Sequence, residues 1–142
     1  MTARFNLRAL AIAATGKMPI RDAVGEVQKD EAGNPLTITF HSPGSKAFQK
    51  AKHAAEQRNN DRVMARMQGK SEAKLSAEDK AAERAEFLAA CTISIDGADL
   101  DGQSGHEAFK ALYSDLELGH IADDADKFLA DRGNFKQGSA TA

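Results

Sequence analysis

The segment SIDGADLDGQSGHE, residues 94–107, gathers side chains that could bind a metal ion. Its carboxylates are Asp96, Asp99, Asp101 and Glu107. An EF-hand calcium loop requires oxygen ligands at loop positions 1, 3 and 5, glycine at position 6 and a bidentate glutamate at position 12. When Gly102 is placed at position 6, position 1 falls on Gly97 and position 12 on Ala108, and neither residue supplies a carboxylate. The register excludes an EF-hand, and we predict a connecting loop with no metal.

Other residues with catalytic or ligand-binding potential are scattered along the chain. The histidines are His41, His53, His106 and His120, and none has a second ligand at the spacing of a zinc site. Cys91 is the single cysteine and lies in an apolar stretch, which favours a buried thiol over a nucleophile. The Gly-Lys-Ser sequence at 69–71 lacks the earlier glycine of a phosphate-binding loop, because Met64 stands there. We therefore expect a protein that is not an enzyme and that binds no cofactor.

The charges are unevenly distributed along the 142 residues. Residues 44–84 contain ten Lys and Arg against six Asp and Glu, whereas residues 91–135 contain three against ten. This polarity predicts contacts with other proteins, or self-association, through complementary surfaces. No apolar run approaches the ~18 residues needed to span a bilayer, so no membrane contact is expected.

The basic segment 46–66 has an alternative interpretation as a helix of a small DNA-binding or packaging accessory protein. Glu56 and Asp61 interrupt its positive charge, and no aromatic residue lies between Phe48 and Phe87 to stack on bases. A solvated helix face is the favoured interpretation, and nucleic-acid binding is not expected.

The elements that must position these residues follow from periodicity and turn chemistry. Residues 5–14 predict a short helix, and alternation within 35–41 predicts a strand that pairs with residues 22–29 in a hairpin. Ser45 is the expected N-cap of a helix reaching about Met67. These patterns place the sheet residues early in the chain.

The remaining chain predicts further helices. Ser76 with Asp79 resembles a capping box that opens a helix to about Ala90, followed by an extended TISI segment. Apolar residues at helical spacing then predict two C-terminal helices; they are Phe109, Leu112, Tyr113, Leu116, Leu118, Ile121, Ala122, Ala125, Phe128 and Leu129. The fold class is α+β, mostly α, with one N-terminal β-hairpin followed by a small bundle of about four helices. Residues 1–135 form one expected domain, and residues 136–142 a disordered tail.

Two segments resemble the tail assembly chaperones of long-tailed bacteriophages. They are GNPLTITFHSPGSKAFQKAKHAAEQRN and FLAACTISIDGADLDGQSGHEAFKALYSDLELGHIADDADKFLADRGNF. In the second segment the matching positions are the Asp96-Gly97 turn, Leu112 and Leu116 of the short helix, and Phe128, Asn134 and Phe135 near its end. Family members often have tryptophan before the Asp-Gly turn and at the start of the last helix, where this chain has Ile95 and the segment ELGH.

The resemblance implies a non-catalytic, phage-encoded factor that acts in the host bacterial cytoplasm and is absent from the mature virion. Such proteins are thought to hold the long helical tape-measure protein in solution and to recruit major tail tube subunits to it. Many also occur in a longer form that arises by a ribosomal frameshift.

Partner binding is assigned to the acidic C-terminal half, at Phe109, Leu112, Tyr113, Ile121, Phe128 and Phe135. A chaperone of a long helix needs an apolar groove rather than an active site. The ring and polar tip of Tyr113 suit an interface. The alternative is that Phe109, Tyr113, Ile121 and Phe128 are core residues.

Overall fold

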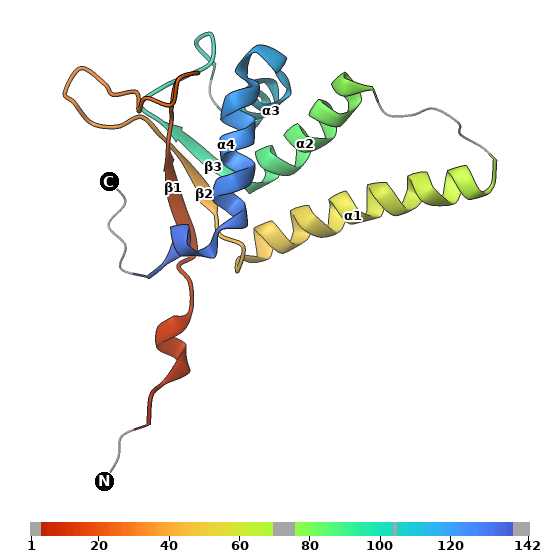
Figure 1. Ribbon diagram of the computed structural model, residues 1–142, viewed down its shortest axis with the longest axis horizontal. Helices are drawn as coiled ribbons and strands as arrows, with labels where there is room; N and C mark the ends of the chain where they lie inside the picture. Colours follow the sequence, from red (N-terminus) through yellow and green to blue (C-terminus); the bar gives the residue numbers. More distant parts are fainter. Residues whose placement is uncertain (1–3, 70–75, 104, 138–142) are drawn as a thin grey trace.

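The computed structural model describes residues 4–69, 76–103 and 105–137. Within these ranges a three-stranded antiparallel sheet has the order β1-β2-β3, with β2 in the centre. The strands are β1 (Thr15–Pro19), β2 (Thr37–His41) and β3 (Thr92–Asp96). Figure 1 shows the three strands side by side. Thr39 of β2 lies opposite Lys17 of β1 and Ser94 of β3.

The described residues also form four α-helices, two before β3 and two after it, so the α+β, mostly α fold class is confirmed. They are α1 (Lys46–Met67), α2 (Ala77–Cys91), α3 (His106–Ser114) and α4 (Gly119–Ala130). Three short 3-10 helices are η1 (Leu7–Leu10), η2 (Leu116–Leu118) and η3 (Arg132–Phe135). No helix in the described ranges is long and apolar enough to cross a membrane.

The predicted helix starts at Ser45 and Ser76 are confirmed. Ser45 Oγ accepts the Phe48 N–H at 3.1 Å. Ser76 Oγ accepts the Asp79 N–H at 3.0 Å while the Asp79 carboxylate accepts the Ser76 N–H at 3.3 Å. These bonds satisfy backbone donors that have no partner inside a helix, and they fix where α1 and α2 begin.

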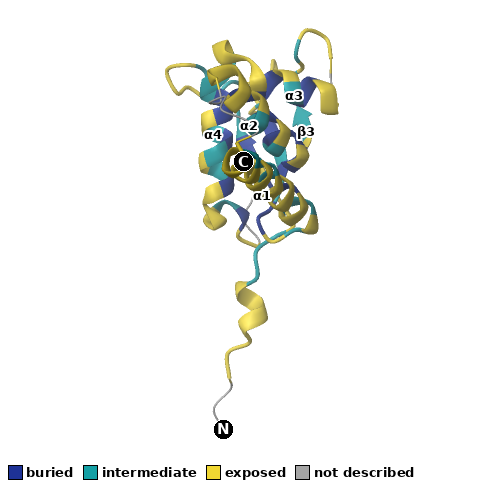
Figure 2. Ribbon diagram, turned by 90° about the vertical axis from the view of Figure 1, so that its right-hand side faces the viewer, coloured by how far each residue is buried: buried dark blue, intermediate teal, exposed yellow. Residues whose placement is uncertain are grey.

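The core lies between one face of the sheet and the helices α2, α3 and α4 (Figure 2). Its buried side chains include Met18, Ile38, Phe40, Leu88, Leu112, Ile121 and Leu129. Phe40 on the central strand lies 5.8 Å from Phe128 on α4, measured between ring centroids. Apolar and polar residues alternate along β2, so its other face carries Thr37, Thr39 and His41.

The first strand of the hairpin is not residues 22–29, as predicted, but Thr15–Pro19. Residues 22–29 contain a turn in which the Asp22 side chain accepts the N–H groups of Val24 and Glu26, and only single bridges flank it. Local alternation could not reveal β1, because Thr15–Pro19 includes glycine and proline and gains its strand geometry from pairing with β2.

The predicted helix at 5–14 is reduced to the single 3-10 turn of η1. All residues of η1 are exposed, so the segment buries no side chain that would offset the cost of forming a longer helix. Residues 4–11, which we call the arm, extend away from the body (Figure 1). Of the predicted tail at 136–142, residues 138–142 lie outside the described residues.

Candidate partner-binding surfaces

The six residues assigned to partner binding come together in the structure, but as part of the core. Five are buried: Phe109, Leu112, Tyr113, Ile121 and Phe135. Phe128 is partly buried and lies 5.2 Å from Phe135, ring to ring. These side chains therefore lie in the core, as the alternative interpretation of the sequence had it. As a set they do not line an exposed groove.

Tyr113 is 1% exposed, so the expectation that its polar tip marks a surface is wrong. The Thr92 hydroxyl donates to the Leu88 carbonyl at 2.8 Å, and the Tyr113 hydroxyl lies 2.7 Å from the same Thr92 oxygen. Because Thr92 has one hydroxyl proton, Tyr113 is the donor in this pair. Burial of the ring and hydroxyl raises the pKa of Tyr113.

Asp96, the first aspartate of the acidic segment, links β2 and β3 on the polar face of the sheet. Asp96 accepts hydrogen bonds from the hydroxyls of Thr37 at 3.0 Å, Thr39 at 2.6 Å and Ser94 at 2.8 Å. Burial is the largest effect on the pKa of Asp96 and raises it, but the three hydroxyls and Lys17 together lower the pKa below its usual value.

The loop after Asp96 behaves as a connector. Asp99 accepts the N–H of Gly102 at 3.0 Å, and Gly97 has a φ of +86°. Among the residues that the structure describes, no group of three His, Cys, Asp or Glu side chains could hold a metal ion. The sequence predicts a turn at Asp96 but not its contacts with β2. The alternation of Thr37 and Thr39 is the signal for these contacts, because it places two hydroxyls on one face of the strand.

Cys91 is fully buried at the end of α2. Burial, with a smaller effect from Asp126, raises the pKa of its thiol to about 12. The thiol is therefore protonated at neutral pH and is a poor nucleophile.

An open trough runs along α2 between α1 and α3. It consists of two adjoining hollows of about 280 Å³ each, which share Arg58 of α1 and Glu83 of α2. The other lining residues are Ala55, Arg62, Ala82, Arg84, Ala85, Glu86, Phe87, Lys110 and Ser114. Small alanine side chains lie between the charged ones, so the backbone of a partner helix could approach α2 closely.

Ion pairs form the rims of this trough. Arg62 of α1 pairs with Glu83, and Lys110 of α3 pairs with Glu86 at 2.9 Å. The hydrogen bond from Lys110 lowers the pKa of Glu86 despite the opposing effect of burial. Both signs of charge thus lie beside an apolar floor, with Arg58 outside these ion pairs, and this arrangement suits an amphipathic helix.

The helix α1 extends beyond the body (Figure 1). Phe48 contacts Phe87 edge to face at 5.5 Å near its start, and Ala51 is its only buried residue. Towards its end, Met64 is 54% and Met67 77% exposed. Methionine side chains adapt to varied apolar partners, so this end offers a second contact area.

No family model matches the chain, and neither a curated protein nor a solved structure is found to be similar to it.

Proposed function

We propose that this protein is a non-catalytic tail assembly chaperone, which holds a long helical partner, the phage tape-measure protein, and brings major tail tube subunits to it. The observation that carries the proposal is the trough on α2, with its alanine floor and its rims of both charge signs. The resemblance of residues 30–135 to that family supports the choice of partner. The site of action is then the host bacterial cytoplasm, and the protein is absent from the mature virion.

The proposed binding site for the partner helix is the trough on α2 and not the six C-terminal residues that the sequence indicated. Those side chains fill the core, whereas Ala82 on the trough floor is exposed. A partner helix lying there would bury its apolar stripe against alanine and place charged side chains beside Arg58 and Glu86. Apolar burial would drive association at about 25 cal/mol per Å², and the charged rims would set orientation.

Co-expression with a tape-measure protein tests the proposal. The protein should keep that product soluble and be recovered in complex with it, and Ala82→Trp should abolish capture by filling the trough. Ala90→Trp is the matched control, because Ala90 is also an exposed alanine of α2 but does not line the trough. Equal solubility of the partner with and without this protein, and no complex, would refute the proposal.

DNA binding by α1 is the second candidate function, favoured by the exposure of nearly the whole helix. Two features weaken it: Arg62 is paired with Glu83, and the Phe48 ring is packed on Phe87. Tight binding of duplex DNA at ~0.2 M salt, where counterion release contributes little, would support this function over the chaperone.

A further inference from the structure

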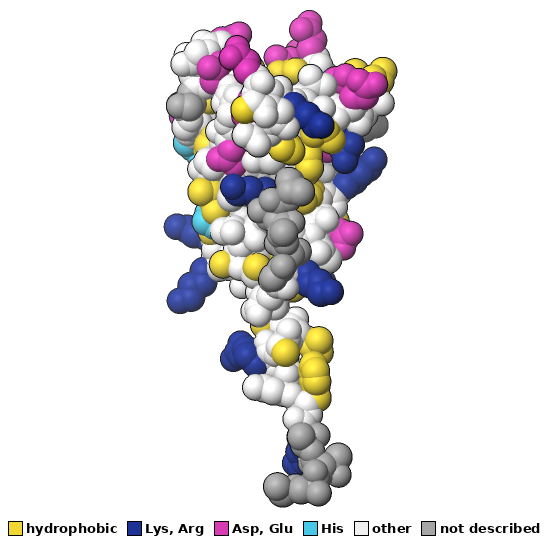
Figure 3. Space-filling view, turned by 90° about the vertical axis from the view of Figure 1, so that its left-hand side faces the viewer, with side chains coloured by type: hydrophobic (Ala, Val, Ile, Leu, Met, Phe, Trp, Pro, Cys, Tyr) yellow, Lys and Arg dark blue, Asp and Glu magenta, His cyan; other side chains and the backbone are white. Residues whose placement is uncertain are grey.

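The arm, residues 4–11, presents apolar side chains that nothing in the described part of the chain covers. Phe5 is 67%, Leu7 73% and Leu10 67% exposed. The turn that carries them is ordered by a local bond, because the Asn6 side chain accepts the Arg8 N–H at 3.0 Å. Figure 3 shows apolar and basic side chains together on this projection. Exposed apolar clusters of this kind mark interaction sites.

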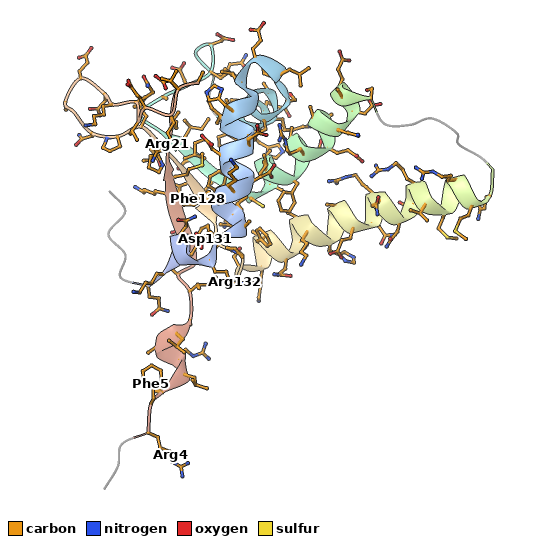
Figure 4. The ribbon with its side chains drawn as sticks, in the orientation of Figure 1. Arg4, Phe5, Arg21, Phe128, Asp131 and Arg132 are labelled. Carbon is orange, nitrogen blue, oxygen red and sulfur yellow. The ribbon has the colours of Figure 1, made fainter. Side chains whose placement is uncertain are left out.

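The arm is held away from its own body at its root. Ile12 pairs with Lys136 in an antiparallel bridge, and the Ala13 N–H donates to the Phe135 carbonyl at 2.6 Å. Figure 4 shows Phe5 far from Phe128, on the projection below the body. With this anchor in place, Phe5 and Leu7 lie away from the described part of their own chain. A partner molecule could cover them in this arrangement.

A groove of about 360 Å³ lies between β1 and α4 and could receive the arm. Met18, Pro19 and Phe128 supply its apolar lining, and Asp124 and Asp131 supply carboxylates. Figure 4 shows Phe128 and Asp131 beside β1, with Arg21 further along the chain from that strand. The groove is large enough for one aromatic ring such as that of Phe5.

The arm is basic, and the groove offers carboxylates that could receive its arginines. The arm carries Arg4 and Arg8, and no acidic residue occurs from position 4 to position 21. Asp124 forms no ion pair within the described residues, in contrast to Asp123 and Asp126, which both pair with Arg84. The groove also contains Lys127 and Arg21, and the Arg21 guanidinium donates to the Gly25 carbonyl at 2.9 Å. The Asp131 carboxylate accepts the Gly133 N–H at 2.9 Å. Asp124 is therefore the groove carboxylate most open to an incoming arginine.

The other hollows suit the arm less well. The hollow beside η3 is lined by Lys52 and Arg132 and by no carboxylate, so it offers the arginines of the arm no partner of opposite charge. In the trough on α2, Glu83 and Glu86 are already paired with Arg62 and Lys110.

The position of β1 at the edge of the sheet indicates which molecule supplies the arm. The arm precedes Thr15 at one end of β1, whereas the groove lies at Met18 and Pro19, at the other end. When two copies set their β1 edges side by side and antiparallel, the arm of each copy lies next to the groove of the other. Extended at about 3.3 Å per residue, the arm could span roughly 25 Å, longer than the ~17 Å of a five-residue strand.

We propose that two copies of this chain exchange their arms. Phe5 of each copy enters the groove between β1 and α4 of the other copy, and Arg4 and Arg8 lie beside its Asp124. The arrangement has two-fold symmetry and closes on itself, because each copy gives one arm and receives one. It does not depend on the tail-chaperone function.

Light scattering of the full chain, measured over a range of concentrations, tests the exchange. The wild-type protein should form dimers, and the double variant Phe5→Ser, Leu7→Ser should raise the dissociation constant at least about tenfold. Val24→Ser is the control, because Val24 is 81% exposed in a turn outside the arm and the groove. A wild-type protein that stays monomeric throughout, or an equal effect of Val24→Ser, would overturn the proposal.

A charge exchange identifies the docking site. Arg4→Asp with Arg8→Asp in one protein, and Asp124→Lys in another, should each weaken self-association. A mixture of the two proteins should form heterodimers, because both arms in that pair meet a groove of opposite charge. If Asp124→Lys leaves self-association unchanged and the mixture gives no heterodimer, the arm does not dock on this groove and the proposal fails.

Discussion

Truncating Tyr113 to alanine tests whether this ring belongs to the core or to an interface. The ring is 1% exposed between α2, α3 and β3, and replacing a buried large aromatic residue with alanine costs roughly 3–5 kcal/mol. A domain of this size has about 5–15 kcal/mol of total stability, so Tyr113→Ala should remove a large part of it. We expect a protein close to its unfolding threshold at 37 °C.

Tyr113→Phe separates the hydroxyl from the ring. Tyr113 donates to Thr92, and Thr92 keeps its own bond to the Leu88 carbonyl when the tyrosine hydroxyl is removed. No buried donor is left without a partner, so the loss should be about 0.5–1.5 kcal/mol, the net value of one hydrogen bond. The cost of Tyr113→Phe should therefore be well below that of Tyr113→Ala.

Urea unfolding followed by far-ultraviolet circular dichroism measures both losses, provided that the slope m is unchanged. The core position would be refuted if Tyr113→Ala lowered stability by less than about 1 kcal/mol and yet prevented capture of a helical partner. A Tyr113→Phe loss as large as that of Tyr113→Ala would refute the assigned donor and acceptor.

Three further predictions concern the acidic segment and the buried thiol. Because the pKa of Asp96 is lowered in the folded state, its charge stabilises the fold above the unfolded pKa of about 3.9, and this stabilisation is lost as pH falls through the folded pKa. Asp96→Asn should therefore cost about 1 kcal/mol at pH 7, measured by urea unfolding. The difference in stability between the variant and the wild type should disappear in strong acid. Gly97→Ala should cost about 1–3 kcal/mol in the same assay, more than Gly102→Ala, because both residues have positive φ but only at Gly97 would the new Cβ lie 2.9 Å from Leu36. Cys91 should react with a thiol reagent at pH 8 at least about 100-fold more slowly in the native protein than in urea, and equal rates would contradict its burial.

The sequence alone determined the elements that depend on local chemistry. The starts of α1 and α2 are marked by Ser45 and by the Ser76–Asp79 pair. Each serine oxygen accepts a free backbone N–H only three residues further along, so the interaction is visible in the local sequence. The spacing of Phe109, Leu112 and Tyr113 likewise predicted α3, since one buried face repeats with the helical period. The α+β class followed from these local patterns.

Only the tertiary structure decided which strand joins β2 and which apolar side chains stay exposed. The ladder of β1 joins residues that are 18 to 26 positions apart, from Pro19 with Thr37 to Thr15 with His41. The Phe135 ring packs so close to Gly16 that an added Cβ would lie 2.7 Å from it. The three hydroxyls around Asp96 come from two strands separated by α1 and α2. Periodicity shows that a residue is apolar and on one face, but burial of Tyr113 and exposure of Phe5 depend on where distant segments lie. These contacts are long-range, so no local pattern contains them.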